Sequence, residues 1–260
     1  MLAGATATAV AVTIVLWLLG PLETGLQEPS TPSPETFVTQ KGQRTSIRLS
    51  DGSQVRLNVD SRLTVPPSFG KQKRVVRLKG EAFFEVREDS TRPFIVRSEG
   101  AVTRVLGTTF DVGAYPEEDK VKVIVAEGRV ALHAEKSSNS QNVGRQEEDR
   151  NVILTKNQVS LIPRNGGQII RREEDLSEHL AWIDGQLAFN DAPFDEVARR
   201  LERWYDIEIT LEDGTAIPSG HLNAEFTGDR SLSDVLLVID AAFDLRHEQN
   251  GNRITFSSLR

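Results

Sequence analysis

The 260-residue sequence contains no cysteine, and this absence excludes several kinds of chemistry. Disulfide bonds, zinc–thiolate sites and cysteine nucleophiles all require a thiol. The absence does not fix the cellular compartment, because an exported protein can also lack cysteine. Two Tyr and three Trp leave few aromatic side chains that could stack on bases or sugars.

Positive charge is scarcer than negative charge. The sequence has 31 Lys and Arg against 38 Asp and Glu, which gives a net charge of -7. Nucleic-acid binding normally requires a basic patch, so this balance argues against that function. Apolar residues make up 38% of the chain and charged residues 27%, which is sufficient for a packed core. The length indicates one or two domains.

Motifs of common enzymes and metal sites are also missing. The sequence has no Walker loop, no GxSxG and no GxGxxG. Gly107-Thr108-Thr109 is too short for a phosphate loop, and Glu147-Glu148-Asp149 is more simply a solvated run of charges than a metal site. No metal-ligand spacing joins any two of the histidines His133, His179, His221 and His247. We therefore predict a protein that is not an enzyme and needs no cofactor.

The first residues form the longest uncharged stretch of the chain. Residues 2–20 (LAGATATAVAVTIVLWLLG) match the length needed to span a bilayer core. A cleaved signal peptide would show a basic start and a small-x-small cleavage site, and neither is evident. A buried core helix is a further alternative. We predict a transmembrane helix over residues 1–20, followed by a proline-rich extended linker over residues 21–39.

Short β-like runs dominate residues 40–163. Val55 and Leu57 alternate with polar residues directly after Asp51-Gly52, and Asp-Gly between alternating runs is a strong hairpin signal. We predict four similar hairpins, with turn centres at Gly52, Gly80, Gly128 and Asn157. A loose repeat of this kind fits a stack of β units, although a β-sandwich would explain the strands equally well.

The composition changes after Pro163. Residues 164–184 are predicted to be a connector with a short helix over 175–182. Residues 185–260 then show the order strand, helix, strand, strand, helix, strand. Asn190-Asp191 is the predicted cap of the first helix and Ser231 that of the second. This pattern predicts a small α+β domain that ends in a turn at residues 250–252.

Five short motifs resemble the FecR family, whose members are inner-membrane sigma-factor regulators. They occur in the expected order and are LSDGS at 49–53, GEAFFEV at 80–86, RPF at 92–94, LGTTFDV at 106–112 and EGRV at 127–130. The resemblance implies a twisted, solenoid-like β domain over residues 40–163. It also implies a single pass through the inner membrane, with most of the chain in the periplasm.

The end of the chain resembles the short domain shared by secretins and the N-termini of TonB-dependent receptors. The similar runs are AWIDGQLAF at 181–189, PFDEV at 193–197 and LERWY at 201–205. This resemblance implies a βαββαβ domain over residues 185–260, a combination that occurs in FecR-like proteins. The predicted fold class is therefore mainly β with a small α+β domain.

The family resemblance also implies a function. The chain would relay a signal from the signalling domain of a TonB-dependent outer-membrane receptor to a sigma factor of the extracytoplasmic-function (ECF) class. In the family, a cytoplasmic helical domain that precedes the anchor holds the sigma factor. That domain is not part of this sequence, so we expect the sigma-factor contact to be indirect. The alternative is a periplasmic structural or assembly module, either secretin-associated or polysaccharide-binding. The β domain has no Trp and only Tyr115, which counts against sugar binding.

Two segments are candidates for binding a protein partner. Trp204-Tyr205 ends a predicted helix and either packs between helix and sheet or lies in an interface, where aromatic residues are enriched. The strand 222–226 is a candidate edge strand that could accept a partner strand. The predicted partner-binding residues are Trp204, Tyr205, Leu222, Asn223, Ala224, Glu225 and Phe226.

Overall fold

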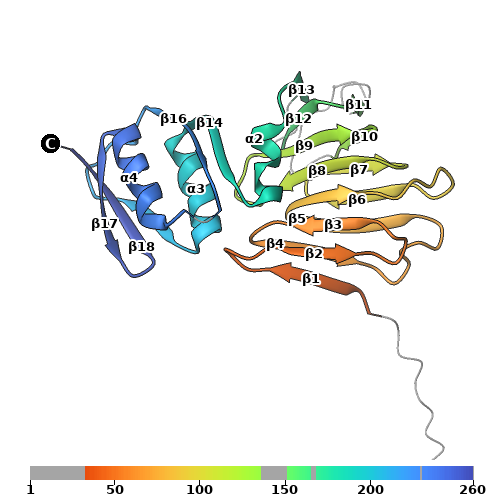
Figure 1. Cartoon of the computed structure of the whole chain (residues 1–260). Coiled ribbons are helices and arrows are strands. Elements are labelled where there is room, and N and C mark those ends of the chain that lie inside the picture. Colours follow the sequence, from red (N-terminus) through yellow and green to blue (C-terminus); the bar gives the residue numbers. More distant parts are fainter. Residues whose placement is uncertain (1–32, 136–150, 165–167, 229, 260) are drawn as a thin grey trace, which may run out of the picture. The chain divides into compact units, whose positions relative to one another are not determined.

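The computed structural model describes residues 33–135, 151–164, 168–228 and 230–259 (Figure 1). The predicted transmembrane helix and most of the predicted linker therefore lie outside the described residues. The prediction that the linker extends to residue 39 is wrong, because Glu35–Thr39 form a strand that pairs with the large sheet. Within those residues, no helix combines the length and the apolar character needed to cross a membrane. Residues Pro34–Arg260 form one compact unit.

A curled sheet of 13 strands makes up the first part of the described chain (Figure 1). Its strands are β1 (Glu35–Thr39), β2 (Thr45–Arg48), β3 (Gln54–Leu57), β4 (Ser61–Val65), β5 (Arg74–Glu85), β6 (Phe94–Ser98), β7 (Ala101–Val105), β8 (Thr109–Ala114), β9 (Lys120–Glu127), β10 (Arg129–Ala134), β11 (Asn151–Thr155), β12 (Gln158–Pro163) and β13 (Ile170–Glu173). All but one of the pairings between them are antiparallel, the exception being β5 with β6.

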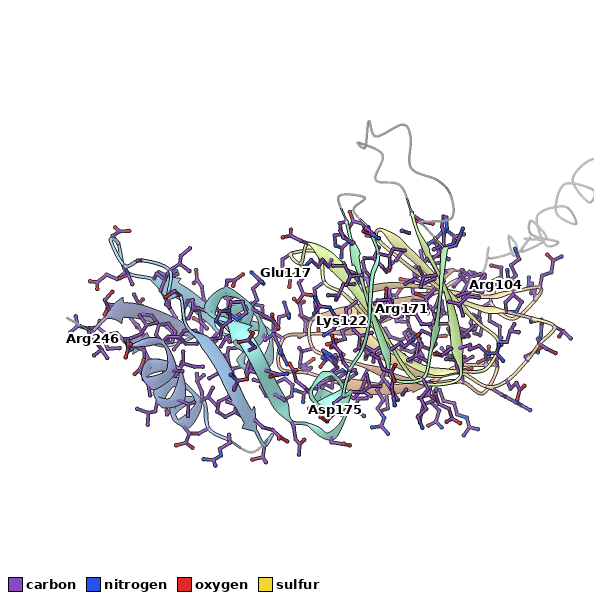
Figure 2. All side chains as sticks on the ribbon, turned by 90° about the horizontal axis from the view of Figure 1, so that it is seen from above. Arg104, Glu117, Lys122, Arg171, Asp175 and Arg246 are labelled. Atoms are coloured by element: carbon purple, nitrogen blue, oxygen red, sulfur yellow. The ribbon has the colours of Figure 1, made fainter. Side chains whose placement is uncertain are left out.

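The long strand β5 joins two halves of this sheet. Its first half pairs with β4 and β6, and its second half pairs with β3 and β8. The first half-sheet therefore contains β1, β4, β6, β7, β10 and β11, and the second contains β2, β3, β8, β9, β12 and β13. Side chains fill the space that the sheet encloses (Figure 2). At its centre, the Phe84 ring lies 5.9 Å from that of Phe94 and 5.1 Å from that of Phe110.

The prediction of four hairpins is correct only for Gly52, which connects the paired strands β2 and β3. Gly80 lies inside β5, where the strand passes from the first half-sheet to the second. Gly128 and Asn157 lie where the chain crosses between the halves, and the φ angles of these three residues are 93°, 88° and 64°. A residue in the left-handed backbone conformation is required both in a hairpin turn and where the chain passes from one half-sheet to the other. The local sequence therefore does not distinguish the two.

The C-terminal module, defined here as β14 to β18, contains two helices and two small sheets. Its elements are β14 (Leu187–Pro193), α3 (Phe194–Tyr205), β15 (Glu208–Leu211), β16 (His221–Phe226), α4 (Leu232–Phe243), β17 (Leu245–Asn250) and β18 (Arg253–Ser258). β14 pairs with β16, and β18 pairs with both β15 and β17. The predicted mainly β chain with a small α+β domain is confirmed, but the final hairpin adds one strand to the predicted βαββαβ order.

One of the two predicted helix caps is confirmed. The Ser231 hydroxyl accepts a hydrogen bond from the backbone N–H of Asp234 at 3.2 Å and caps α4. The prediction of a cap at Asn190-Asp191 is wrong, because α3 begins after Pro193 without a side-chain cap. Asp191 instead has a φ of 53°, in an irregular part of the pairing between β14 and β16. An Asx residue tolerates this conformation, which explains why the sequence resembles a cap.

The connector contains less helix than the sequence predicts. The α-helix α2 covers only Ser177–Leu180 and continues as a 3₁₀ turn, η2, over Ala181–Asp184. The Asp175 carboxylate accepts a hydrogen bond from the backbone N–H of Ser177 at 3.0 Å. Gly185 ends the turn in the left-handed conformation. The 3₁₀ turn places Trp182 against the large sheet, where the side chain is buried.

Candidate functional site

The strand β16 has one paired edge in the described chain. It pairs with β14, and no other described strand pairs with it. Leu222 and Phe226 are 2% and 6% exposed and point into the module, whereas Asn223 and Glu225 are exposed. Ala224 is half-buried against the module's core. The second backbone edge of β16 therefore has no strand partner among the described residues.

Trp204 and Tyr205 lie at the end of α3, and both are half-buried against the core of the C-terminal module. The guanidinium of Arg44, from the turn after β1, lies 3.5 Å from the centre of the Trp204 ring. The Tyr205 hydroxyl donates to the backbone oxygen of Arg230 at 3.1 Å. Burial, with the nearby charge of Asp234, raises the pKa of Tyr205. Each aromatic residue therefore has a partner within the chain, which matches packing between helix and neighbouring segments.

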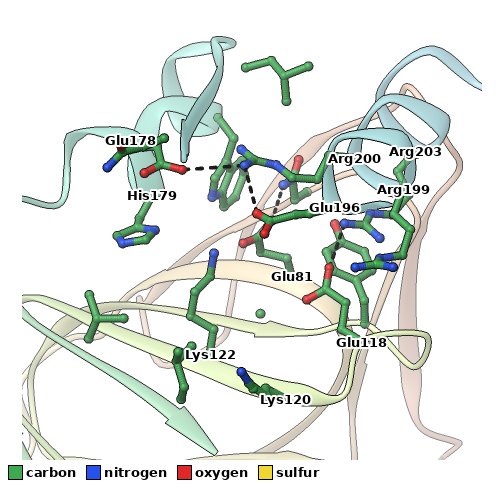
Figure 3. Close-up of a pocket in the computed structure, with 18 of the residues that line it drawn as sticks. Glu81, Glu118, Lys120, Lys122, Glu178, His179, Glu196, Arg199, Arg200 and Arg203 are labelled. Carbon is green, nitrogen blue, oxygen red and sulfur yellow. Dashed lines mark hydrogen bonds and ion pairs between the residues drawn. The ribbon is translucent and has the colours of Figure 1, made fainter. Parts of the chain in front are cut away.

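Arg203, which precedes these aromatic residues, makes the closest contacts between the C-terminal module and the large sheet. Its side chain is 7% exposed, and it forms an ion pair with Glu117 at 2.6 Å. A second ion pair joins it to Glu118 at 2.9 Å (Figure 3). The guanidinium also lies 3.9 Å from the centre of the Tyr115 ring. The backbone oxygen of Arg203 accepts a hydrogen bond from Gly42 N–H at 2.8 Å. No local pattern in the sequence indicates this role.

Tyr115 anchors the other side of this contact. The residue is 3% exposed, and its hydroxyl donates to the backbone oxygen of Val59 at 2.8 Å. Burial and the charge of Glu81 raise the pKa of Tyr115 well above its usual value, while Arg203 opposes the shift. Tyr115 therefore stays neutral and donates this hydrogen bond at physiological pH.

A polar cleft of about 610 Å³ lies between the second half-sheet, the connector and α3 (Figure 3). Lys120 and Lys122 line it from β9, and Glu81 lines it from β5. On the opposite wall, Arg200 lies 3.7 Å from Glu178 and 3.5 Å from Glu196. Pockets for small molecules are mostly apolar, so this mixed charge favours a contact between polar protein surfaces. No group of three or more acidic or histidine side chains among the described residues could hold a metal ion.

We expect Arg203→Met to lower the free energy of unfolding by about 2 kcal/mol, because the buried guanidinium makes two charge-assisted hydrogen bonds. The loss stays moderate since Glu117 and Glu118 are 42% and 32% exposed and regain water. Urea unfolding of the full chain measures the change. Arg199→Met is the matched control: its pair with Asp195 is an exposed i,i+4 pair worth under about 0.5 kcal/mol. Equal effects of the two substitutions would contradict a special role for Arg203.

Comparison with known proteins agrees with this architecture. Residues 35–131 match the family described as FecR protein, and residues 186–256 match the family described as FecR, C-terminal. Two crystal structures of a proposed anti-sigma factor from Parabacteroides distasonis ATCC 8503, at 1.65 and 2.50 Å resolution, are similar to the chain. Each superimposes with a TM-score of 0.76 and 30% sequence identity, over 87% of this chain and 100% of the other. No curated protein matches the sequence. The chain belongs to the FecR family.

Proposed function

We propose that this chain is a membrane-anchored regulator of an ECF sigma factor. It receives its signal from a TonB-dependent outer-membrane receptor and has no enzymatic activity. The observation that carries the proposal is the match of two FecR regions in order along one chain, together with a similar fold in a proposed anti-sigma factor.

The proposed location is the inner membrane, with residues 34–260 in the periplasm. The uncharged run over residues 2–20 supports a single anchoring helix. Pro21, Pro29 and Pro32, which precede the folded unit, would hold it away from the membrane surface. Such a tether leaves the C-terminal module accessible to a receptor domain that reaches across the periplasm.

The proposed receptor contact is strand addition to β16. The free edge of this strand offers backbone donors and acceptors, and alternate residues Asn223 and Glu225 face solvent beside it. Binding there would shift the population of states of the tethered unit, because a ligand stabilises whichever state it binds better. The resulting change would pass to the large sheet through the Arg203 contacts and the connector.

Binding of the full chain, in detergent, to purified receptor signalling domains tests this proposal. We expect one receptor domain to bind selectively, and we expect deletion of residues 185–260 to abolish binding. If no receptor domain binds a chain whose circular dichroism shows intact folding, the relay is wrong. The alternative of a periplasmic structural or assembly module then becomes the better explanation.

Proline substitutions at two neighbouring positions test whether the receptor contact lies on β16. Backbone N–H groups of a strand alternate between its two edges, so either Ala224→Pro or Glu225→Pro removes an outward N–H and leaves the pairing with β14 intact. The proline variant that keeps the pairing with β14 should remain folded. We expect it to bind the receptor domain at least about tenfold more weakly than the wild type, which corresponds to one lost hydrogen bond or more. Glu225→Ala keeps the backbone donor and should retain affinity. Unchanged binding by the folded proline variant would exclude strand addition to β16.

A further inference from the structure

The second half-sheet carries an apolar patch on its outer face, opposite the core that the two halves share. The outer patch consists of Phe83, Asp111, Ile124 and Val159, which are direct neighbours across β5, β8, β9 and β12. Phe83, Ile124 and Val159 are 7%, 0% and 3% exposed. Strands β8 and β9 lie beside α2 and the turn that follows it (Figure 1). Trp182 of that turn is 7% exposed, and its side chain lies beside the carboxyl of Asp111.

Asp111 is the one polar residue of the outer patch, and it is fully buried. Neither of its carboxyl oxygens makes a hydrogen bond of standard geometry within the described chain, and neither does the indole N–H of Trp182. The indole nevertheless lies close enough to the carboxyl for a weaker polar contact, which favours the ionised form. Buried carboxyl groups without partners are rare, because removing such a group from water is costly. The sheet residues around Asp111 therefore do not explain why a carboxylate stands at this position.

The charged groups around Asp111 are few. Glu81 faces it from β5 and Lys122 from β9, and Arg56 on β3 and Arg172 on β13 end the same row of the sheet. Burial raises the pKa of Asp111 well above its usual value, and the charge of Glu81 adds to this shift. Lys122 and Trp182 oppose it. The carboxyl thus resists ionisation for as long as it is buried.

We propose that η2 is a releasable latch: Trp182 closes over the buried carboxyl of Asp111, and its lifting exposes that carboxyl and frees the connector from the large sheet. Burial of the Trp182 side chain, which is 7% exposed, favours the closed latch. Removal of the Asp111 carboxyl from water opposes closure, because a buried carboxyl loses its hydration. The hydrogen bond from Arg56 to the backbone oxygen of Ile183 is long, at 3.4 Å, and adds little.

The latch lies in the connector that joins the large sheet to the C-terminal module. It follows β13, the last strand of the large sheet, and precedes β14, the first strand of the C-terminal module. Opening therefore alters how the module is joined to the sheet without unfolding either of them. An element with two such arrangements can convert a binding event at the module into a change at the sheet.

The extent to which the Asp111 carboxyl opposes closure of the latch depends on pH. Below the usual pKa of an aspartate, about 4, the carboxyl is protonated whether the latch is open or closed, so its ionisation does not affect closure. As the pH rises towards the raised pKa of the closed state, only the open state ionises, and closure weakens. Above that raised pKa the weakening is constant. The latch is therefore tightest in acid and loosens as the pH rises.

Hydrogen–deuterium exchange of the full chain, analysed by mass spectrometry, tests the latch. Opening breaks the hydrogen bonds that Gly185 and Gln186 donate to the backbone oxygens of Trp182 and Ala181. We expect Asp111→Asn and Asp111→Val to slow exchange in residues 181–186 several-fold at pH 8, after correction for intrinsic rates. The difference from wild type should shrink as the pH approaches 4. Trp182→Ala should accelerate exchange in the same segment.

The control is Asp119→Asn, which neutralises an exposed carboxylate at the edge of the cleft and should leave this exchange unchanged. Faster exchange in both Asp111 variants would show that the carboxyl stabilises the closed connector, and unchanged exchange would show that it does not oppose closure. Either result overturns the proposal. A difference that is independent of pH would also overturn it. No receptor domain is present in this experiment, so its failure is distinct from failure of the proposed relay.

Discussion

Arg74→Met should lower the free energy of unfolding of the chain by about 3–5 kcal/mol, the range for breaking a buried ion pair. Arg74 and its partner Asp51 are 1% and 4% exposed, and their side chains lie 3.0 Å apart. Methionine keeps much of the buried apolar stem but leaves the Asp51 carboxylate without its cation. The large loss follows from that uncompensated buried charge.

The guanidinium of Arg74 also holds two loops in place. It donates to the backbone oxygens of Arg92 at 2.8 Å, Arg87 at 2.7 Å and Leu106 at 3.1 Å. These carbonyl groups belong to the segments that connect β5 to β6 and β7 to β8. Methionine offers them no donor, and a buried carbonyl that loses its partner is destabilising.

Urea unfolding of the full chain, followed by far-UV circular dichroism, measures this effect. The matched control is Arg77→Met, an exposed position on the same strand, which should change stability by no more than about 0.5 kcal/mol. A loss below about 1 kcal/mol for Arg74→Met would show that the loops are held by other contacts. A change in the slope of the urea dependence would indicate an altered extent of unfolding rather than lost contacts.

Arg74 illustrates which features the sequence predicts and which it does not. The alternating apolar residues of β5 and the exposed and buried alternation of β16 follow from a period of two and were predictable. The role of Arg74 depends on Leu106, which is 32 positions away, and on a parallel pairing of β5 with β6. No local pattern carries such information, because it arises only when distant strands come into register.

The same reasoning applies to the candidate site. The aromatic pair Trp204-Tyr205 is conspicuous in the sequence, whereas its neighbour Arg203 looks like an ordinary surface residue of an amphipathic helix. Arg203 is buried because the turn after β8 brings Tyr115 and two carboxylates to it. Asp111 likewise looks like a turn residue after Gly107-Thr108-Thr109. It is nevertheless fully buried, and Trp182 reaches it from the connector.

Gly80→Ala is the second substitution that should have a large effect, a loss of about 3–4 kcal/mol in the free energy of unfolding. Gly80 has a φ of 93°, which an alanine adopts only with strain of about 1–2 kcal/mol. A Cβ atom at this position would also lie 2.7 Å from both Cα and Cβ of Ser61. The clash with backbone atoms cannot be relieved by a change of rotamer.

Ser61 has little freedom to move away from such a Cβ atom. It is 3% exposed, its hydroxyl donates to the backbone oxygen of Val59 at 2.8 Å, and it accepts from the backbone N–H of Glu81 at 2.9 Å. These bonds fix the corner at which β4 approaches β5. A displacement of Ser61 would therefore disturb the pairing of both strands at the junction of the two half-sheets.

Gly70→Ala separates the two contributions to this loss. Gly70 has a φ of 79°, but no heavy atom lies within 4 Å of a Cβ placed there, so only the backbone strain remains. Urea unfolding should give a loss of about 1 kcal/mol for Gly70→Ala and a clearly larger one for Gly80→Ala. In the Gly80→Ala background, Ser61→Gly removes the side chain that the new methyl group meets but leaves the backbone of residue 61 in its way, so it should restore only part of the stability. Equal losses at the two glycines would mean that the junction yields to the added methyl group, and that β5 tolerates a displacement where it passes between the half-sheets.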